Sequence, residues 1–349
     1  MISPMGGTST SAQASADMDA VEAIMRRGGS VLRERMVRME THLERVTAAA
    51  GEPLASHAAG TVLAGGKRLR PLLVVLAAES AGGPGDTGEG EERLVRAAVA
   101  VELVHSATLV HDDVIDGAQL RRGRPSVAAA AGRQFAIATG DLLFSRAFAE
   151  LARNRDEVQL RALSDASSAL AEGELLQRED AYATHVAVAR YLRRCELKTA
   201  ALFEAACRLG ALVAVAGSPA LADQLGAFAR RIGLAFQLLD DVLDVSGPVE
   251  RTGKARGTDL LDGTVTLPFI LARERDAKLA EFDLSSLGGP EQAEQLCERI
   301  AATGALDEAR ERALTLVARA KSGLPRDLPD GRGATLLDLV ADAVVERYR

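Results

Sequence analysis

The sequence predicts an all-α protein, built as a single large helical bundle, and three observations support this. Apolar residues recur at three- and four-residue spacing, which is typical of helices with one buried face. Alternation of β-branched and polar residues is scarce, and no segment keeps a period of two. The chain has 349 residues, of which 47% are hydrophobic, and this is sufficient for one large core.

The expected helices follow one another between breaks that are rich in glycine and proline. Helical spacing is clearest in five segments, which are residues 69–80, 92–110, 160–177, 191–212 and 221–245. A break over residues 81–90 separates the first two, and Gly247-Pro248 follows the last. Further breaks at residues 285–290 and 322–325 divide the C-terminal part. This pattern fits a helical bundle with its site in the bundle core.

Two similar aspartate clusters each follow an apolar, helix-like run. Their members are Asp112, Asp113 and Asp116 in the first cluster, and Asp240, Asp241 and Asp244 in the second. Positions i and i+4 of a helix share a face about one turn (~5.4 Å) apart, so the first and last aspartate of each cluster project together. Like charges at this spacing repel unless a cation lies between them. Carboxylates without a nearby Cys or His cluster favour Mg²⁺. The two clusters therefore predict facing walls that hold a diphosphate through metal ions.

A single cluster of this kind is more often a solvated helix end. Here a second copy lies on an equally apolar helix, and Arg121, Arg122 and Arg124 follow the first copy within a glycine-containing turn. Arginine side chains bind phosphate oxygens through two parallel hydrogen bonds. The turn would therefore place phosphate-binding arginines close to the aspartates of the first cluster. Because the two clusters must meet in one site, we expect one domain over residues 21–349. Residues 1–20 have neither a basic n-region nor an apolar h-region, so we expect a disordered tail rather than a signal peptide.

Composition excludes several classes of function. The net charge of −7 gives no electrostatic support for binding nucleic acid. Cys195, Cys207 and Cys297 are widely spaced and form no CxxC pair, which indicates reduced core residues of a cytoplasmic protein. No uninterrupted apolar run reaches the ~20 residues of a membrane span, so we expect no integral membrane segment.

Taken in order, the motifs along the chain resemble the polyprenyl diphosphate synthase family of trans-prenyltransferases. The matching stretches are residues 65–71, 102–105, 112–116, 121–123, 140–141, 173–174 with Gln177, 198–200, 236–244, 253–254 and 266–268. Any one of them is weak, but in this order they are highly specific. The resemblance implies a bundle of the isoprenoid synthase type, a homodimer, and an enzyme that condenses isopentenyl diphosphate with an allylic diphosphate.

The resemblance also implies a role for each candidate residue. Asp112, Asp116 and Asp240 would be ligands of Mg²⁺, with three ions per site and Mn²⁺ as a substitute, and Asp113, Asp241 and Asp244 would be ligands or supports. The isopentenyl diphosphate site would comprise Lys67, Arg70, His105 and Arg122. The allylic diphosphate site would comprise Arg121, Lys198, Thr199, Gln237 and Lys254. Oxygen atoms of Thr199 and Gln237 would also face the passing carbocation, so these two and Lys198 count as catalytic residues alongside the aspartates.

One position departs from the family pattern. Family members often carry Lys where this chain has Thr264, so the loop that contains it has lost one cation that would contact a diphosphate.

Product length is predicted from the residues that precede the first cluster. Helical geometry places Thr108, Val104 and Val101 on successive turns above Asp112, with Ala107 beside them. Short-chain members of the family carry bulky aromatic residues just before the first cluster, whereas these four residues are small or medium-sized. Each added isoprene unit buries five more carbons, and this burial stabilises the bound product by ~3–4 kcal/mol as long as the tunnel stays open. We therefore expect a medium- to long-chain all-trans polyprenyl diphosphate, with a geranylgeranyl or farnesyl product as the alternative.

Two other classes share part of the pattern. A class I terpene cyclase has the same bundle and first acidic motif, but cyclases usually replace the second cluster with Asn, Ser and Glu and line the pocket with aromatics. Here the second cluster is complete and aromatic residues make up only 3% of the chain. A non-catalytic subunit would be expected to lose acidic or basic motif residues, and here both sets are present.

Overall fold

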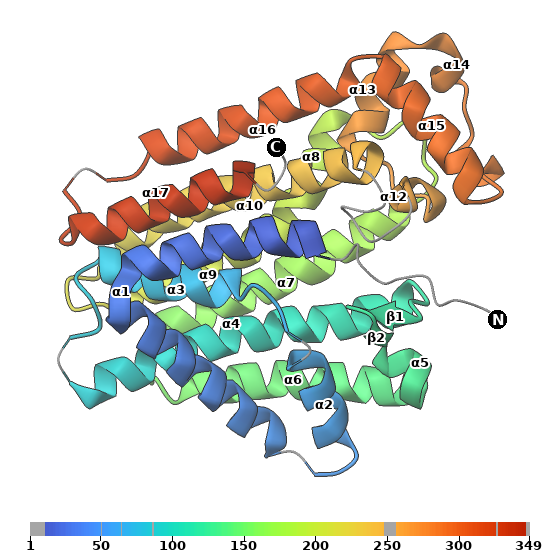
Figure 1. Ribbon diagram of the computed structural model, residues 1–349. Helices are drawn as coiled ribbons and strands as arrows, with labels where there is room; N and C mark the ends of the chain where they lie inside the picture. Colours follow the sequence, from blue (N-terminus) through green and yellow to red (C-terminus); the bar gives the residue numbers. More distant parts are fainter. Residues whose placement is uncertain are drawn as a thin grey trace, which may run out of the picture.

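The computed structural model describes residues 11–49, 51–63, 65–85, 87–247, 256–325 and 327–346. The N-terminal helices are α1 (Ser11–Ala48), α2 (Leu54–Val62), α3 (Leu69–Ser80), α4 (Gly88–Ile115), α5 (Val127–Ala131) and α6 (Arg133–Ala152) (Figure 1). The middle of the chain forms α7 (Glu157–Glu179), α8 (Val188–Cys195), the π-helical turn η1 (Glu196–Ala200), α9 (Ala201–Val213) and α10 (Pro219–Ser246). The C-terminal elements are α12 (Thr258–Leu261), α13 (Leu267–Arg275), α14 (Ala277–Ala280), the short 3₁₀ helix η2 (Leu284–Ser286), α15 (Pro290–Ala302), α16 (Ala305–Ser322) and α17 (Gly331–Glu346).

These elements confirm the all-α prediction. Four of the five predicted segments lie within α3, α4, α7 and α10. The fifth, residues 191–212, is divided between α8 and α9 by the turn η1, which the apolar spacing does not predict. The described strands, β1 (Leu120–Arg121) and β2 (Arg124–Pro125), pair antiparallel in a minimal hairpin. That hairpin is the glycine-containing turn that follows the first aspartate cluster.

Local chemistry fixes where the long helices begin. The Thr87 hydroxyl accepts a hydrogen bond from the backbone N–H of Gly90 and caps α4, and the Asp156 carboxylate caps α7 in the same way. Ser218 caps α10, with Pro219 at the first helical position, where its missing N–H costs nothing. The two helices that end in aspartate clusters therefore start at defined points.

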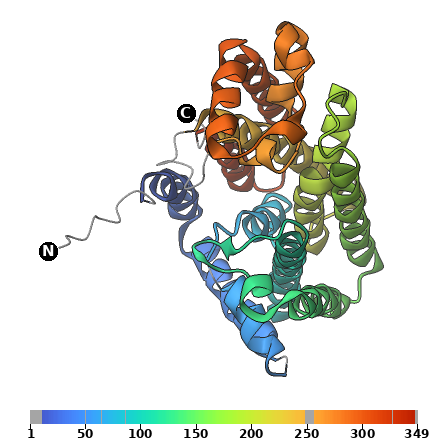
Figure 2. The ribbon, with the colours of Figure 1, turned by 90° about the vertical axis from the view of Figure 1, so that its right-hand side faces the viewer.

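The core lies between α3, α4, α9 and α10. α4 packs against α6 and α9, and α10 packs against α9 and α16. Figure 2, in which many of the helices are seen close to end-on, shows the C-terminal helices (orange) above and the N-terminal helices (blue) below. Gly210 of α9 lies directly against α3, because a Cβ there would be 2.1 Å from the carbonyl oxygen of Val74. The largest fully buried side chains include Tyr191, Phe203 and Phe228.

Helix α4 is long and apolar enough, by length and composition alone, to cross a bilayer. In this fold, however, 72% of its most apolar window is buried inside the bundle. The core helix of a water-soluble protein passes the same test, so α4 is weak support for a membrane span.

The predicted N-terminal tail lies partly outside the described residues. Residues 1–10 are not described, and from Ser11 the chain belongs to helix α1. The disordered tail over residues 1–20 stays a prediction. The boundary of the single domain at residue 21 stays a prediction.

Candidate active site

One cavity of about 390 Å³ joins the ends of α4 and α10 to α7, the turn η1 and residues 258–266. Of the predicted aspartates, those on its wall are Asp112 and Asp116 from one side and Asp240 and Asp241 from the other. The two clusters therefore meet at one site, as the sequence predicts. Asp259 and Asp262 also line the cavity. These two residues lie between the matched stretches at residues 253–254 and 266–268, and no role was predicted for them from the sequence.

The three aspartates of the first cluster have different surroundings. Asp112 is half-buried, and burial raises its pKa to about 6, against the opposing attraction of Lys198. Asp113 is buried and accepts hydrogen bonds from Nε and Nη2 of Arg121, at 2.9 and 2.5 Å. Asp116 is exposed and pairs with Arg178 of α7. Asp113 therefore holds Arg121 in place, while Asp112 and Asp116 face the cavity.

The second cluster is supported from behind. Asp241 is only 3% exposed, and each of its oxygens accepts a hydrogen bond: Oδ2 from the Tyr191 hydroxyl at 2.6 Å and Oδ1 from Nε2 of Gln237 at 2.7 Å. Burial raises the pKa of Asp241, and the charge of Asp259 raises it further. Asp244 lies outside the cavity wall and accepts a hydrogen bond from the backbone N–H of Asp259 at 3.3 Å. Asp240 is thus the member of this cluster that is placed most like Asp112.

The donor set fits a hard divalent cation. Four predicted aspartates, together with Asp259 and Asp262, line one cavity, and carboxylate oxygens suit Mg²⁺. Within the described part of the chain, no three His, Cys, Asp or Glu side chains lie close enough together to hold an ion alone. Ions here would therefore complete their shells with substrate phosphate oxygens, which is the usual arrangement for Mg²⁺.

Cationic and neutral donors lie deeper in the same cavity. Arg70 lines it with its guanidinium 4.8 Å from the Phe203 ring, and its buried Nε has no hydrogen-bond partner among the described residues. Burial lowers the pKa of Arg70 to about 10, so this side chain stays charged at neutral pH. Burial also lowers the pKa of His105 well below its ordinary value, helped by the charges of Arg70 and Arg122. His105 is therefore a neutral hydrogen-bonding group.

The remaining residues of the predicted isopentenyl diphosphate site lie beside this cavity rather than on its wall. Arg122 packs against the Gly65-Gly66 turn, because a Cβ on Gly66 would be 3.0 Å from Nη2 of Arg122. Lys67 follows in the same turn and is exposed. Arg68, which the sequence analysis left without a role, is held by Glu40 and Glu102, each at 2.6 Å. The contact between Gly66 and Arg122 thus brings the Gly65-Gly66 turn next to the β1–β2 hairpin.

The turn η1 presents the predicted allylic residues. Gly173 of α7 permits a close approach, because a Cβ there would be 2.5 Å from the backbone nitrogen of Lys198. The Lys198 ammonium group pairs with Glu174, which also accepts a hydrogen bond from Nε of Arg178 at 3.1 Å. The Thr199 hydroxyl donates to Oε1 of Gln237 at 2.7 Å. Lys198, Thr199, Gln237, Arg121 and Thr264 all line the cavity. Lys254 lies outside the described residues.

Of the four predicted chain-length residues, only Thr108 lies on the cavity wall. Val101, Val104 and Ala107 are fully buried in the packed core. The structure therefore brings Thr108 to the cavity, and the role of all four in setting product length stays a prediction.

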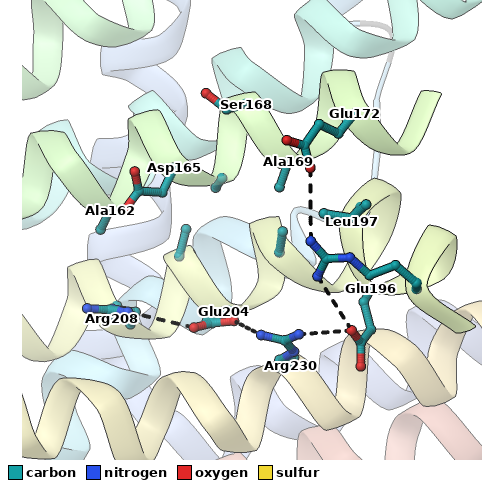
Figure 3. Close-up of a pocket in the computed structure, with 14 residues that line it drawn as sticks. Ala162, Asp165, Ser168, Ala169, Glu172, Glu196, Leu197, Glu204, Arg208 and Arg230 are labelled. Carbon is teal, nitrogen blue, oxygen red and sulfur yellow. Dashed lines mark hydrogen bonds and ion pairs between the residues drawn. The ribbon is translucent and has the colours of Figure 1, made fainter. Parts of the chain in front are cut away.

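Helix α7 has a second charged face, away from the cavity. A hollow of about 320 Å³ lies on this side, between α7, η1, α9 and α10 (Figure 3). Its acidic and basic side chains are paired across the helices, with Arg230 2.9 Å from Glu196 and 3.4 Å from Glu204. Glu172 lines this hollow, whereas Glu174 pairs with Lys198. None of the predicted site residues lines it.

Comparisons with known proteins agree with this site. The family model described as polyprenyl synthetase matches residues 52–302. A heptaprenyl diphosphate synthase component 2 from Geobacillus stearothermophilus is 42% identical over 70% of this chain and 74% of its own length. A geranylgeranyl diphosphate synthase from Methanosarcina mazei is 38% identical over 81% of this chain and 86% of its own.

The fold comparison points the same way. A crystal structure of a polyprenyl synthase from Caulobacter crescentus, complexed with calcium and isoprenyl diphosphate, superposes with a TM-score of 0.84 and 34% identity, over 94% of this chain and 98% of that one. The family match covers more than half of the sequence and includes both aspartate clusters. The chain therefore belongs to the polyprenyl synthetase family of prenyltransferases.

Proposed function

We propose that this protein condenses isopentenyl diphosphate with an allylic diphosphate, in a Mg²⁺-dependent reaction, to make a medium- to long-chain all-trans polyprenyl diphosphate. One observation supports this above all others. A single cavity is lined by carboxylates from two helices and by Arg70, His105 and Lys198. This is the charge arrangement that two diphosphates and their metal ions require.

The chemistry follows from these charges. The allylic carbon–oxygen bond breaks, the bonding electrons leave with the diphosphate, and the double bond of isopentenyl diphosphate attacks the resulting carbocation. A proton is then lost, and the released diphosphate can accept it. Bound Mg²⁺ would neutralise the charge that develops on the leaving group. Asp112, Asp116 and Asp240 would hold the ions, while Asp113, Asp241 and Asp244 would orient neighbouring groups.

Two sets of side chains would separate the substrates. Arg70 and His105, together with Lys67 and Arg122 on the adjoining turns, form the isopentenyl diphosphate side. Arg121, Lys198, Thr199, Gln237 and Lys254 form the allylic side. Glu174 supports this division, since it pairs with Lys198 and keeps that ammonium group at the metal end of the cavity.

Product length is proposed from the wall of the cavity. Thr108 is small, and the residues that line the space beyond it include Leu109, Leu170 and Leu202, which are apolar. The relatives named above make heptaprenyl and geranylgeranyl products, so a medium- to long-chain product is our first proposal and geranylgeranyl diphosphate the alternative.

We also propose that the protein is a cytoplasmic homodimer. Its three cysteines are buried and unpaired, as expected in a reducing compartment. Phe135 and Ile137 of α6 and Leu175 of α7 are exposed apolar side chains, which a second copy could cover. The Geobacillus relative is named as one component of an enzyme, so a different second subunit is the alternative.

The test uses the purified chain alone. It is incubated with Mg²⁺, isopentenyl diphosphate and a series of allylic starters, and the dephosphorylated products are sized by chromatography. We expect elongated products that disappear when EDTA is added, and a dimer by light scattering. If the chain makes no product alone but becomes active with a second protein, the homodimer proposal is wrong. If Mg²⁺ with any starter yields a cyclic hydrocarbon, the protein is a cyclase.

A further inference from the structure

A chain of four polar side chains runs from the core to the cavity wall. The Tyr191 hydroxyl donates to Oδ2 of Asp241 at 2.6 Å, and Nε2 of Gln237 donates to Oδ1 of Asp241 at 2.7 Å. The Thr199 hydroxyl donates to Oε1 of Gln237 at 2.7 Å. Tyr191 has no exposed surface and does not line the cavity, whereas the other three residues do. Tyr191 also neighbours Arg194 and Cys195, which line the cavity, but its hydroxyl reaches Gln237 and Thr199 through Asp241.

Donor and acceptor chemistry fixes the direction of the Gln237 amide. The NH₂ group of Gln237 points toward Asp241, because its Nε2 donates to Oδ1 of that carboxyl group. The carbonyl oxygen of the same amide then points toward Thr199 and the cavity. A flipped amide would present its positive N–H end to the cavity instead, and the Thr199 hydroxyl could still accept a hydrogen bond from it. Asp241 is thus the group that selects one of the two orientations.

Tyr191 is itself held firmly. The Arg194 guanidinium lies 5.4 Å from the centre of the Tyr191 ring, and Arg194 is only 3% exposed. Arg194 donates a hydrogen bond to the carbonyl oxygen of Val265 at 2.6 Å, and Asp180 at the end of α7 pairs with it at 3.4 Å. Thr266, the residue after Val265, lines the cavity. The support behind Asp241 is therefore tied to the end of α7 and to the segment that precedes Thr266.

We propose that Tyr191 is a positioning residue which, by holding Asp241, directs the carbonyl oxygen of Gln237 toward the allylic carbocation. A carbonyl oxygen stabilises a cation by its dipole, and the N–H end of the amide would oppose it. Tyr191 touches no substrate, so it affects the charged intermediate and not the binding of the two diphosphates. This inference rests on the proposed condensation reaction.

The test compares Tyr191→Phe, which removes a single hydroxyl, with Tyr182→Phe as a matched control. Tyr182 is 45% exposed, and its hydroxyl lies 3.5 Å from the carbonyl oxygen of Leu261. A hydrogen bond to a charged group is worth enough to change kcat roughly tenfold or more. We expect this loss of kcat in Tyr191→Phe with both KM values changed less than about twofold, and wild-type kinetics in Tyr182→Phe.

Binding of two inert analogues provides a second measurement. One carries an ammonium nitrogen at the position of the carbocation, and the other is a thiolo-diphosphate of the same length, with no positive charge at that position. Isothermal titration calorimetry in the presence of Mg²⁺ should show roughly tenfold weaker binding of the ammonium analogue to Tyr191→Phe, and unchanged binding of the thiolo analogue. Equal losses for both analogues, or an unchanged kcat, would overturn the inference.

Gln237→Met keeps the test decisive if Tyr191→Phe does not fold, because methionine has a similar length without the amide dipole. Gln237→Met should weaken binding of the ammonium analogue more than binding of the thiolo analogue. If Tyr191→Phe does fold, adding it to Gln237→Met should cause no further loss. Equal binding of the two analogues to Gln237→Met would refute the inference. Failure of the wild-type protein to make any product would instead refute the proposed function.

Discussion

Replacing Asp112 by Asn should stabilise the metal-free protein while abolishing most of its activity. Asp112 is half-buried at the cavity wall, close to the negative charges of Glu174 and Asp116. Without a metal ion its ionised form is unfavourable. Asparagine has nearly the same shape and no charge, so it removes that penalty along with the proposed metal ligand.

The size of the stability gain follows from the pKa of Asp112. Burial raises this pKa from the ordinary 3.8 to about 6. Each tenfold change in proton affinity corresponds to ~1.4 kcal/mol, so ionised Asp112 costs the folded protein up to about 3 kcal/mol at pH 8. The variant also loses the attraction of Lys198, and the buried amide keeps part of the desolvation cost. We therefore expect a net gain of ~1–3 kcal/mol, or roughly 2–5 °C in Tm.

The dependence on pH has a definite sign. Because the folded-state pKa is raised, the penalty is fully present above about pH 6 and fades as the pH falls toward 3.8, where the carboxyl is protonated in both states. Thermal unfolding is followed by circular dichroism with EDTA at pH 8 and pH 5. The Tm difference between variant and wild type should be larger at pH 8. Asp165→Asn, an exposed aspartate on the outer side of α7, serves as the control and should change Tm little at either pH.

Two results would refute this reasoning. A variant that is less stable than wild type at pH 8 would show that Asp112 makes favourable contacts that outweigh its burial. A Tm gain of the same size at both pH values would show that the effect does not come from the charge. In the Mg²⁺ assay, turnover by Asp112→Asn should fall by at least about 100-fold, and near-normal turnover at low Mg²⁺ would contradict the assignment of Asp112 as a metal ligand.

Three further predictions concern other parts of the site. Arg70→Ala should raise the KM for isopentenyl diphosphate roughly tenfold or more, and the KM for the allylic starter much less. Lys198→Ala should show the reverse. Equal effects on both KM values in steady-state assays would contradict the assignment of these residues to separate substrates. Thr108→Phe should shorten the product toward geranylgeranyl or farnesyl diphosphate, and an unchanged product distribution from an active variant would remove Thr108 from the tunnel. Gly173→Ala should lower Tm, by several degrees, and lower kcat, because its Cβ would lie 2.5 Å from the backbone of Lys198; a fully active variant of normal stability would show that the two helices can separate freely.

Much of the fold and part of the site follow from short-range patterns in the sequence. Helical spacing predicts α3, α4, α7 and α10, and the i, i+4 rule predicts that Asp112 and Asp116 share a face. Asp112 and Asp240 are far apart in the sequence, but the two equivalent motifs made it predictable that they would line one cavity.

Other contacts could not be predicted because they depend on how the helices pack. Tyr191 and Asp241 are separated by 50 residues, and nothing in either local sequence indicates that they touch. Arg178 reads as an ordinary helical partner of Glu174 at i+4, yet it also reaches Asp116 from the opposite wall. Asp259 and Asp262 lie outside any motif, and only the path of the chain after α10 brings them to the cavity.

The π-helical turn η1 makes the length of the chain, and not only its residue types, a determinant of the site. A π turn contains one residue more than the α turn it replaces, and each extra residue would rotate a regular helix by about 100°. Because the bulge absorbs this rotation, Tyr191 in α8 and Phe203 in α9 both stay in the core while Lys198 and Thr199 between them reach the cavity. Deleting a single residue from η1 would let the segment close into an uninterrupted α-helix. The buried side chains could then keep their register only if Lys198 and Thr199 left the cavity wall, so insertions and deletions here should be tolerated far less than substitutions.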